Sequence, residues 1–183
     1  MTLPEGWLTP EEAKELERLA TDQVVLEIGA WLGLSTVTMA RVARHVVSVD
    51  HHRGSSEHQQ GGACFDEHLV DEESRIDTWP QFWTNIRTNG VRDRVTPIIA
   101  TTEQIGPLLR SSSFDLVFVD GAHETSAVAR DGELAFRVVR PTGAVAFHDF
   151  NLPSVQFAIE MLHLAWPAVL VGSLAVFPAE PNK

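Results

Sequence analysis

Short apolar runs rich in valine and isoleucine alternate along the chain with longer stretches whose apolar residues recur at helical spacing. This alternation is typical of a parallel sheet covered by helices. The apolar runs predict strands at residues 24–28, 46–50, 95–100, 115–120 and 144–148. The stretches around them predict helices at residues 10–20, 34–44, 79–89, 103–109, 125–139 and 154–164.

Two further apolar runs, residues 168–171 and 174–177, are separated only by Gly172 and Ser173. Two residues of this kind fit a tight hairpin, whereas a parallel connection needs about a dozen or more. The sheet is therefore expected to end in an antiparallel hairpin strand. With right-handed crossovers, the seven runs predict a doubly wound, Rossmann-like α/β fold whose seven-stranded sheet is mostly parallel.

Residues 53–77 break this rhythm, because they are polar, acidic and glycine-containing. The segment looks like an insertion between the second strand and the helix that follows it. A loop of this length in a compact domain is usually a functional lid or is disordered, and the sequence leaves both open. The expected organisation is a single domain over residues 1–183 with an insertion or lid loop at about 53–77.

Composition narrows the classes of function. Cys64 is the only cysteine, which excludes an internal disulfide framework and cysteine-rich zinc sites and favours a reducing, cytoplasmic location. No apolar run approaches the roughly 20 residues of a membrane span, and the first residues lack the apolar region of a signal peptide. The net charge of -11 repels nucleic acid. We therefore expect a small-molecule substrate and neither a membrane nor a nucleic-acid partner, with a homo-oligomer left open.

The end of the first predicted strand carries a candidate ligand site. Residues 27–35 read EIGAWLGLS, with one glycine at the strand end and one at the start of a helix. Such glycines permit a tight turn and close approach of a ligand, and the helix N-terminus offers free N–H groups. Glu27 disfavours a pyrophosphate and favours a ligand with an ammonium group. Asp50, 21 residues after Gly29, can accept both hydroxyls of a ribose.

The same spacing counts against one class of enzyme. It differs from the G-x-G-x-x-G pattern of dinucleotide-binding domains, so a nicotinamide-dependent oxidoreductase is not favoured.

Two segments of the chain resemble a known family. VLEIGAWLGLS at residues 25–35, with VVSVD at 46–50, resembles the first two motifs of class I S-adenosylmethionine (SAM)-dependent methyltransferases. Residues 114–150, with their DGAH tetrad, Asp131 and a closing His-Asp pair, resemble the methyltransferase-24-type domain. Relatives of that domain include O-methyltransferases that act on sugars and other natural products. Where Pro-Gly-Gly is usual in that family, residues 141–143 read Pro-Thr-Gly, a mild change at an expected turn.

The resemblance implies SAM as the cofactor and assigns residues to it. The methionine part of SAM would be surrounded by Glu27, Gly29, Ala30, Gly33 and Ser35. Asp50 would bind the ribose, and Thr102 and Glu103 would contact the adenine.

Acidic residues follow the fourth and fifth predicted strands, at Asp120 and Asp149. Because the carboxyl ends of parallel strands face one crevice, both should lie near each other and near the transferable methyl. Two converging carboxylates are costly unless a cation or a proton is shared. A divalent cation such as Mg²⁺ would relieve this cost and lower the pKa of a substrate hydroxyl.

The residue before Asp149 bears on which ion this site would hold. Metal-dependent relatives carry an acidic pair after strand five, whereas this chain has His148 in the first of those positions. The candidate metal ligands are therefore Asp120, His148 and Asp149, with a softer ion or no metal left open.

Proton transfer has two candidate bases. His123 and His148 could each accept a hydroxyl proton as the oxygen attacks the methyl, and with Asp120 they are the candidate catalytic residues. Either histidine could instead cap a helix or bond the backbone. Methyl transfer itself can rest largely on alignment of donor and acceptor.

Other histidines and aromatic residues are ambiguous. Four histidines lie in or beside the insertion: His51, His52, His58 and His68. Their spacing matches no metal-ligand pattern, so we expect them to be solvated or to face substrate. Trp31, and the aromatic residues within 79–83, could wall a pocket, but aromatics at helical spacing are more often core.

The sequence therefore predicts a SAM-dependent methyltransferase that transfers a methyl group to a hydroxyl oxygen of a small molecule. The preference for oxygen rests on the resemblance. An N-methyltransferase and a non-catalytic or partner-dependent SAM-binding protein are the alternatives. A substrate-shaped cavity beside the SAM sulfur would favour an enzyme.

Overall fold

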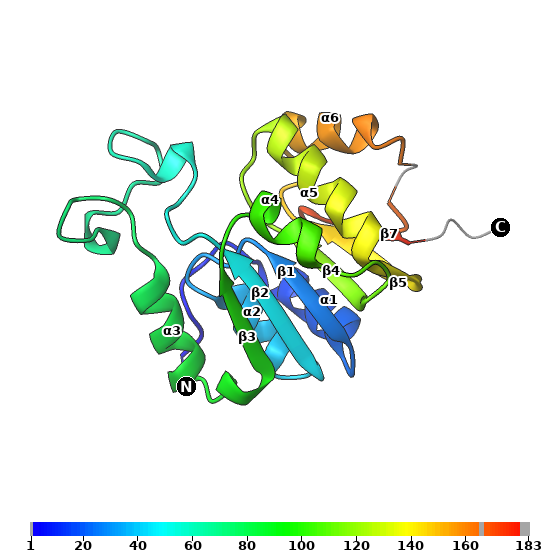
Figure 1. The fold of residues 1–183 in the computed structure, drawn as a ribbon, viewed down its shortest axis with the longest axis horizontal. Helices are drawn as coiled ribbons and strands as arrows, with labels where there is room; N and C mark the ends of the chain where they lie inside the picture. Colours follow the sequence, from blue (N-terminus) through cyan, green and yellow to red (C-terminus); the bar gives the residue numbers. More distant parts are fainter. Residues whose placement is uncertain (1, 165–166, 180–183) are drawn as a thin grey trace.

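The computed structural model describes residues 2–164 and 167–179, which form a sheet with helices on both faces (Figure 1). The strand order is β3-β2-β1-β4-β5-β7-β6. The strands are β1 (Val24–Ile28), β2 (His45–Asp50), β3 (Val95–Ile99), β4 (Phe114–Val119), β5 (Val139–Phe147), β6 (Val169–Val171) and β7 (Leu174–Pro178). The first five run parallel, and β7 is antiparallel to both β5 and β6. The predicted doubly wound fold with an antiparallel C-terminal hairpin is confirmed.

Helices cover the two faces of the sheet in two groups (Figure 1). They are α1 (Pro10–Ala20), α2 (Leu34–Ala40), α3 (Trp79–Thr88), α4 (Thr102–Ile105), α5 (Thr125–Val138) and α6 (Pro153–Met161), with short 3-10 turns η3 (Arg92–Arg94) and η4 (Gly106–Leu108). Helices α1 to α3 share one apolar core, which contains Leu16 and Phe82, and α4 to α6 share another, which contains Leu134 and Phe147. None of the helices in the described ranges combines the length and the hydrophobicity that a membrane span requires.

Several boundaries differ from the predicted ones by one to a few residues, and the largest differences are at the end of α2, the end of α4 and the start of β5. Helix α2 ends at Ala40 rather than at residue 44, and its N-cap is Gly33, whose φ is 89°. Residues 141–143, expected at a turn, lie inside β5. The register between β4 and β5 shifts between Phe114 and Leu116, which accommodates the additional residues of β5 as an irregularity.

Glu12 links helix α1 to the β6–β7 hairpin at one edge of the sheet. Thr9 and Glu12 form a capping box, in which the Thr9 amide donates to the Glu12 carboxylate at 2.8 Å. Glu12 is 1% exposed, and its carboxylate also accepts from the amide and the hydroxyl of Ser173, at 2.6 and 2.9 Å. Because Ser173 lies in the turn between β6 and β7, α1 and the hairpin hold each other beside the end of β5.

The segment of residues 53–77 (the 53–77 loop) projects beside the carboxyl ends of the strands (Figure 1). Two 3-10 turns lie within it, η1 (Ser56–His58) and η2 (Glu67–Leu69). Asp71 accepts from Arg53 at 2.9 Å and from Arg75 at 3.0 Å, and an antiparallel bridge joins Val70 to Ile76. Ile76 is only 1% exposed, so an apolar anchor accompanies these ion pairs. The loop therefore has defined internal structure.

Candidate active site

A cavity of about 470 Å³ opens at the carboxyl ends of the parallel strands. Such crevices are where open parallel sheets bind ligands, and this volume lies within the range of small-molecule sites. The lining includes residues 5–8 ahead of α1, residues 29–32 after β1, part of the 53–77 loop, the start of α4, and the β4–α5 connection with the first turns of α5.

The turn after β1 (the glycine loop, residues 29–33) depends on its two glycines. Gly29 has a φ of +86°, and a Cβ there would overlap the backbone carbonyl of Asp120. Gly33 has a φ of +89°, and a Cβ would lie 3.1 Å from the ring of Phe82. A side chain at Gly29 would therefore separate the glycine loop from the end of β4, where Asp120 lies.

Asp50, at the end of β2, holds the glycine loop in this turn. Its Oδ2 accepts from the amides of Ala30 and Trp31 at 2.8 and 3.0 Å, and its Oδ1 accepts from the amide of His52 at 2.7 Å. Asp50 also lines the cavity. A carboxylate offers about four acceptor positions, so Asp50 retains capacity for a ligand hydroxyl.

Glu27 lies beneath the glycine loop and not on the cavity wall, and it is fully buried. Its carboxylate accepts three hydroxyl hydrogen bonds: from Ser35 at 2.6 Å, from Thr36 at 2.5 Å and from Ser48 at 2.7 Å. Burial raises the pKa of Glu27 to about 7 although these hydrogen bonds lower it. Glu27 thus joins β1, β2 and the start of α2 under the loop, and Gly33 is likewise off the cavity wall.

Thr102 and Glu103, at the start of α4, line the other end of the cavity. The hydroxyl of Thr102 donates to Asp131 at 2.6 Å, and Glu103 pairs with Arg130 at 3.1 Å. Burial raises the pKa of Asp131 to about 6. Both residues predicted to contact adenine are therefore held by α5.

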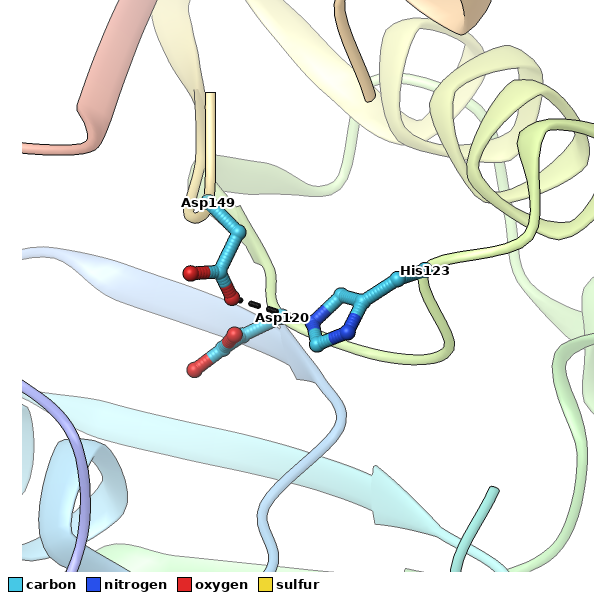
Figure 2. A group of neighbouring side chains, drawn as sticks. All are labelled: Asp120, His123 and Asp149. Atoms are coloured by element: carbon cyan, nitrogen blue, oxygen red, sulfur yellow. Dashed lines mark ion pairs between the residues drawn. The ribbon is translucent and has the colours of Figure 1, made fainter. Parts of the chain in front are cut away.

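Asp120, His123 and Asp149 converge on the cavity from the loops that follow β4 and β5 (Figure 2). His123 Nε2 lies 3.0 Å from Asp149 Oδ2, and its Nδ1 lies 3.1 Å from Glu57 Oε1 of the 53–77 loop. The hydrogen bond to Asp149 raises the pKa of His123 to about 9 against the effect of burial. The side chain of His123 is 31% exposed, so it can meet a ligand in the cavity.

His148 lies behind this group, with its side chain only 4% exposed. Its Nδ1 is 3.2 Å from Asp120 and 3.1 Å from Asp149, while its Nε2 is 3.2 Å from the hydroxyl of Ser173 and 3.5 Å from Glu12. Burial lowers the pKa of His148, but the hydrogen bonds to Asp120 and Asp149 outweigh it and raise the pKa to about 11.

The surroundings of His148 bear on both roles predicted for it. Because the His148 side chain is only 4% exposed, against 31% for His123, and both its ring nitrogens face protein partners, the arrangement suits a buried cation that orients carboxylates better than a general base or a metal ligand. The pKa of Asp149 is correspondingly held well below its usual range, because hydrogen bonds from His123 and His148 outweigh the effect of burial.

Asp120 and Asp149 also belong to a candidate cation site, whose third residue differs from the predicted ligand His148. Asp120, His123 and Asp149 each place one ligand atom within 4.8 Å of the others, so His123 takes the place predicted for His148. Two carboxylates and one imidazole fit a divalent ion such as Mn²⁺, Fe²⁺ or Zn²⁺ better than Mg²⁺, which prefers oxygen ligands alone.

The four histidines in or beside the 53–77 loop separate into different environments. His51 and His58 line the cavity, and His68 is exposed, as predicted. His52 is buried, contrary to the prediction, because its Nδ1 bonds the hydroxyl of Thr78 at 2.8 Å and its ring packs on Phe82.

Residues 26–150 match the model of the methyltransferase-24 family, which is described as a methyltransferase domain. The matched segment runs from β1 to just beyond β5 and contains the glycine loop, Asp50 and the group around His123. This chain belongs to the methyltransferase-24 family. The predicted resemblance to class I SAM-dependent methyltransferases is confirmed.

Three solved structures share the fold of this methyltransferase. Cofactor-bound Rv0187 from MTB is 21% identical, with a TM-score of 0.63 over 88% of this chain and 70% of that chain. The O-methyltransferase TomG from Streptomyces achromogenes, involved in tomaymycin synthesis and solved with SAM, is 18% identical, with a TM-score of 0.61 over 86% and 68%. An O-methyltransferase from Bacillus cereus in complex with SAH is 21% identical, with a TM-score of 0.59 over 88% and 71%.

Proposed function

We propose that this methyltransferase transfers the methyl group of SAM to a hydroxyl oxygen of a small molecule. The observation that carries the proposal is a partly exposed His123 in a cavity that also contains the glycine loop, Asp50 and Asp120. Two structural neighbours are O-methyltransferases solved with SAM or SAH, which supports both the cofactor and the acceptor atom. The open space around His123 favours an enzyme over a SAM-binding protein without catalysis.

Residues after several different strands would each bind one part of SAM. Gly29 and Ala30, which line the cavity, would hold the methionine part, and Asp50 would accept from the ribose while it holds the glycine loop. Thr102 and Glu103 would face the adenine. Bound SAM supplies an electrophilic methyl group on a sulfonium. Alignment of an acceptor oxygen with that methyl group accounts for much of the rate of such a reaction.

His123 is the proton acceptor in this mechanism. As the acceptor oxygen takes the methyl group that bound SAM would supply, the hydroxyl proton passes to Nδ1 of His123, the nitrogen that faces Glu57 of the 53–77 loop, because Nε2 donates to Asp149. Asp149 orients the ring of His123 from 3.0 Å, and the His148 cation holds Asp120 and Asp149 in place. A divalent cation held by Asp120, His123 and Asp149 would instead supply a positive charge that lowers the pKa of the hydroxyl.

We also propose that the 53–77 loop is a lid on a single domain. Its Glu57 reaches His123, and the hydroxyl of Ser56 donates to Glu124 at 2.8 Å, so two contacts join the loop to the β4–α5 connection. Such a cover excludes water from the reacting groups. The free thiol of Cys64, which faces the cavity, suits a reducing compartment such as the cytoplasm.

Calorimetry and a methyl-transfer assay test the proposal. We expect wild-type protein to bind SAM and Asp50→Ala to lose that binding. His123→Ala should keep SAM affinity and lose about 100-fold or more in kcat, the usual contribution of a general base. His163→Ala is the matched control, because His163 is exposed and lies outside the cavity. Absence of SAM binding, or transfer to a nitrogen acceptor in preference to oxygen, would contradict the proposal.

A further inference from the structure

The residues assigned to SAM line only part of the cavity. The walls of the remaining part are residues 5–8 ahead of α1 and the inner side of the 53–77 loop. They face the cavity that His123 also lines, so an acceptor held there can reach the proton acceptor.

Three aromatic rings gather on this wall (the aromatic cluster, Trp7, Trp31 and His58). The ring centroids of Trp31 and His58 are 4.1 Å apart at an interplanar angle of 33°. Trp7 lies 5.7 Å from Trp31 and 6.2 Å from His58. These distances are typical of interacting aromatic rings. The cluster joins three segments that are separate in the sequence: the residues ahead of α1, the glycine loop and the 53–77 loop.

Trp7 is 62% exposed although it belongs to this cluster and lines the cavity. An exposed indole beside a cavity has apolar area available to a ligand. Trp7 is therefore the member of the cluster with the most surface left to offer.

Close backbone packing fixes where the cluster stands. A Cβ at Gly6 would lie 2.8 Å from the Leu34 side chain, so the residues ahead of α1 rest directly on α2. Gly54 has a φ of +64°, and a Cβ there would lie 2.7 Å from the His58 Cβ. The wall is therefore held in position before a ligand arrives, which reduces the entropy lost on binding.

The charges around the same space are mostly negative. Glu5 and Glu57 line the cavity next to the cluster, whereas the other two carboxylates near His123, Asp120 and Asp149, are paired with histidines. The whole chain carries a net charge of -11. An anionic acceptor would meet like charge at this site, which is a strong means of excluding a ligand.

We propose that the aromatic cluster is the acceptor wall and that the acceptor is a planar aromatic hydroxyl compound without negative charge. This inference rests on the proposed methyl transfer. The acceptor ring stacks on Trp7, which is 62% exposed, lies beside the inclined ring of His58, and directs its hydroxyl toward His123. Trp7 and His58 are thus specificity-determining residues, and neither takes part in proton transfer.

The test measures binding of catechol to the SAH-saturated protein by calorimetry, together with KM and kcat for methyl transfer. Trp7→Ala should raise the catechol Kd and KM about tenfold, the effect of losing one stacked ring, with the SAM Kd within about twofold of wild type. Trp7→Phe should recover most of the affinity. Phe157→Ala is the matched control, because Phe157 is 56% exposed on α6 and lies outside the cavity. An unchanged catechol Kd in Trp7→Ala, or a loss confined to SAM affinity, would overturn the inference.

Two further probes test the class of acceptor. 3,4-Dihydroxybenzoate should bind at least about tenfold more weakly than catechol because of its carboxylate, and methyl glucoside should bind more weakly still. Tighter binding of either compound would refute the assigned acceptor class, as would SAM binding without catechol binding. Failure of the proposed function looks different, because the wild-type protein would then not bind SAM at all.

Discussion

Replacement of Glu27 by glutamine tests how burial and hydrogen bonding balance beneath the glycine loop. The carboxylate is fully buried and accepts from three hydroxyls, and burial raises its pKa from 4.5 to about 7. A carboxylate whose pKa is higher in the folded protein stabilises that protein while it is protonated. This contribution is fully present below pH 4.5 and is lost as the pH rises through about 7.

The size of this contribution follows from the shift in pKa. A rise from 4.5 to about 7 corresponds to about 3 kcal/mol, at about 1.36 kcal/mol per pKa unit. About 2–3 kcal/mol of it is lost between pH 5 and pH 8. Glu27→Gln has no proton to lose. Its free energy of unfolding relative to wild type should therefore shift in favour of the variant by about 2–3 kcal/mol over this interval.

Urea denaturation followed by circular dichroism at pH 5 and pH 8 measures this difference. Glu11→Gln on the exposed side of α1 is the control, and its stability relative to wild type should not follow the same course. A constant difference between Glu27→Gln and wild type at both pH values would refute the reasoning. It would mean that the three hydroxyl hydrogen bonds offset the cost of burying the charge.

Three other predictions concern the cavity. Gly29→Ala should lower the free energy of unfolding by about 2–4 kcal/mol and abolish SAM binding. The reason is that the added methyl group would overlap the Asp120 carbonyl, and that the backbone there has a φ of +86°. An unchanged melting temperature with intact SAM affinity would argue against this prediction. Since the pKa of His123 is raised to about 9 and only the neutral ring accepts a proton, kcat/KM should rise with pH up to about 9, and the rise should vanish in His123→Ala. A profile that falls over this range would exclude His123 as the base. Treatment with EDTA should leave kcat within about twofold of the untreated enzyme, because the positive charge of His148 already compensates the negative charges of Asp120 and Asp149. Activity that is lost on chelation and restored by Mn²⁺ would favour the cation site.

The sequence predicts the sheet well because each strand and helix repeats its own local pattern. The predicted limits of β1 and α1 agree with the structure, at Val24–Ile28 and Pro10–Ala20. The hairpin at Gly172 also follows from local geometry, since its φ of 58° suits glycine in a two-residue turn. The end of α2 was less predictable, because apolar spacing does not mark where packing against the sheet stops.

The partners of the charged side chains are harder to infer, because they depend on contacts between distant segments. Glu27 belongs to the strand before the glycine loop, and only the packed structure shows its carboxylate turned toward three hydroxyls. Glu12 has the sequence signature of a capping box, with Thr9 three residues before it. Nothing in that local motif indicates Ser173, which is 161 residues away.

These long-range contacts explain how one site can hold two carboxylates close to His123, the proposed proton acceptor. His148 stands between Glu12 and Ser173 on one side and Asp120 and Asp149 on the other, so α1 and the β6–β7 turn determine where its positive charge lies. That charge compensates Asp120 and Asp149, which leaves Asp149 able to orient the exposed His123. The two histidines therefore have different roles, because the side chain of His148 is 4% exposed and contacts four protein partners, whereas that of His123 is 31% exposed. A catalytic role for His123 thus depends on residues at both ends of the chain's described fold, and not only on the motif that follows β4.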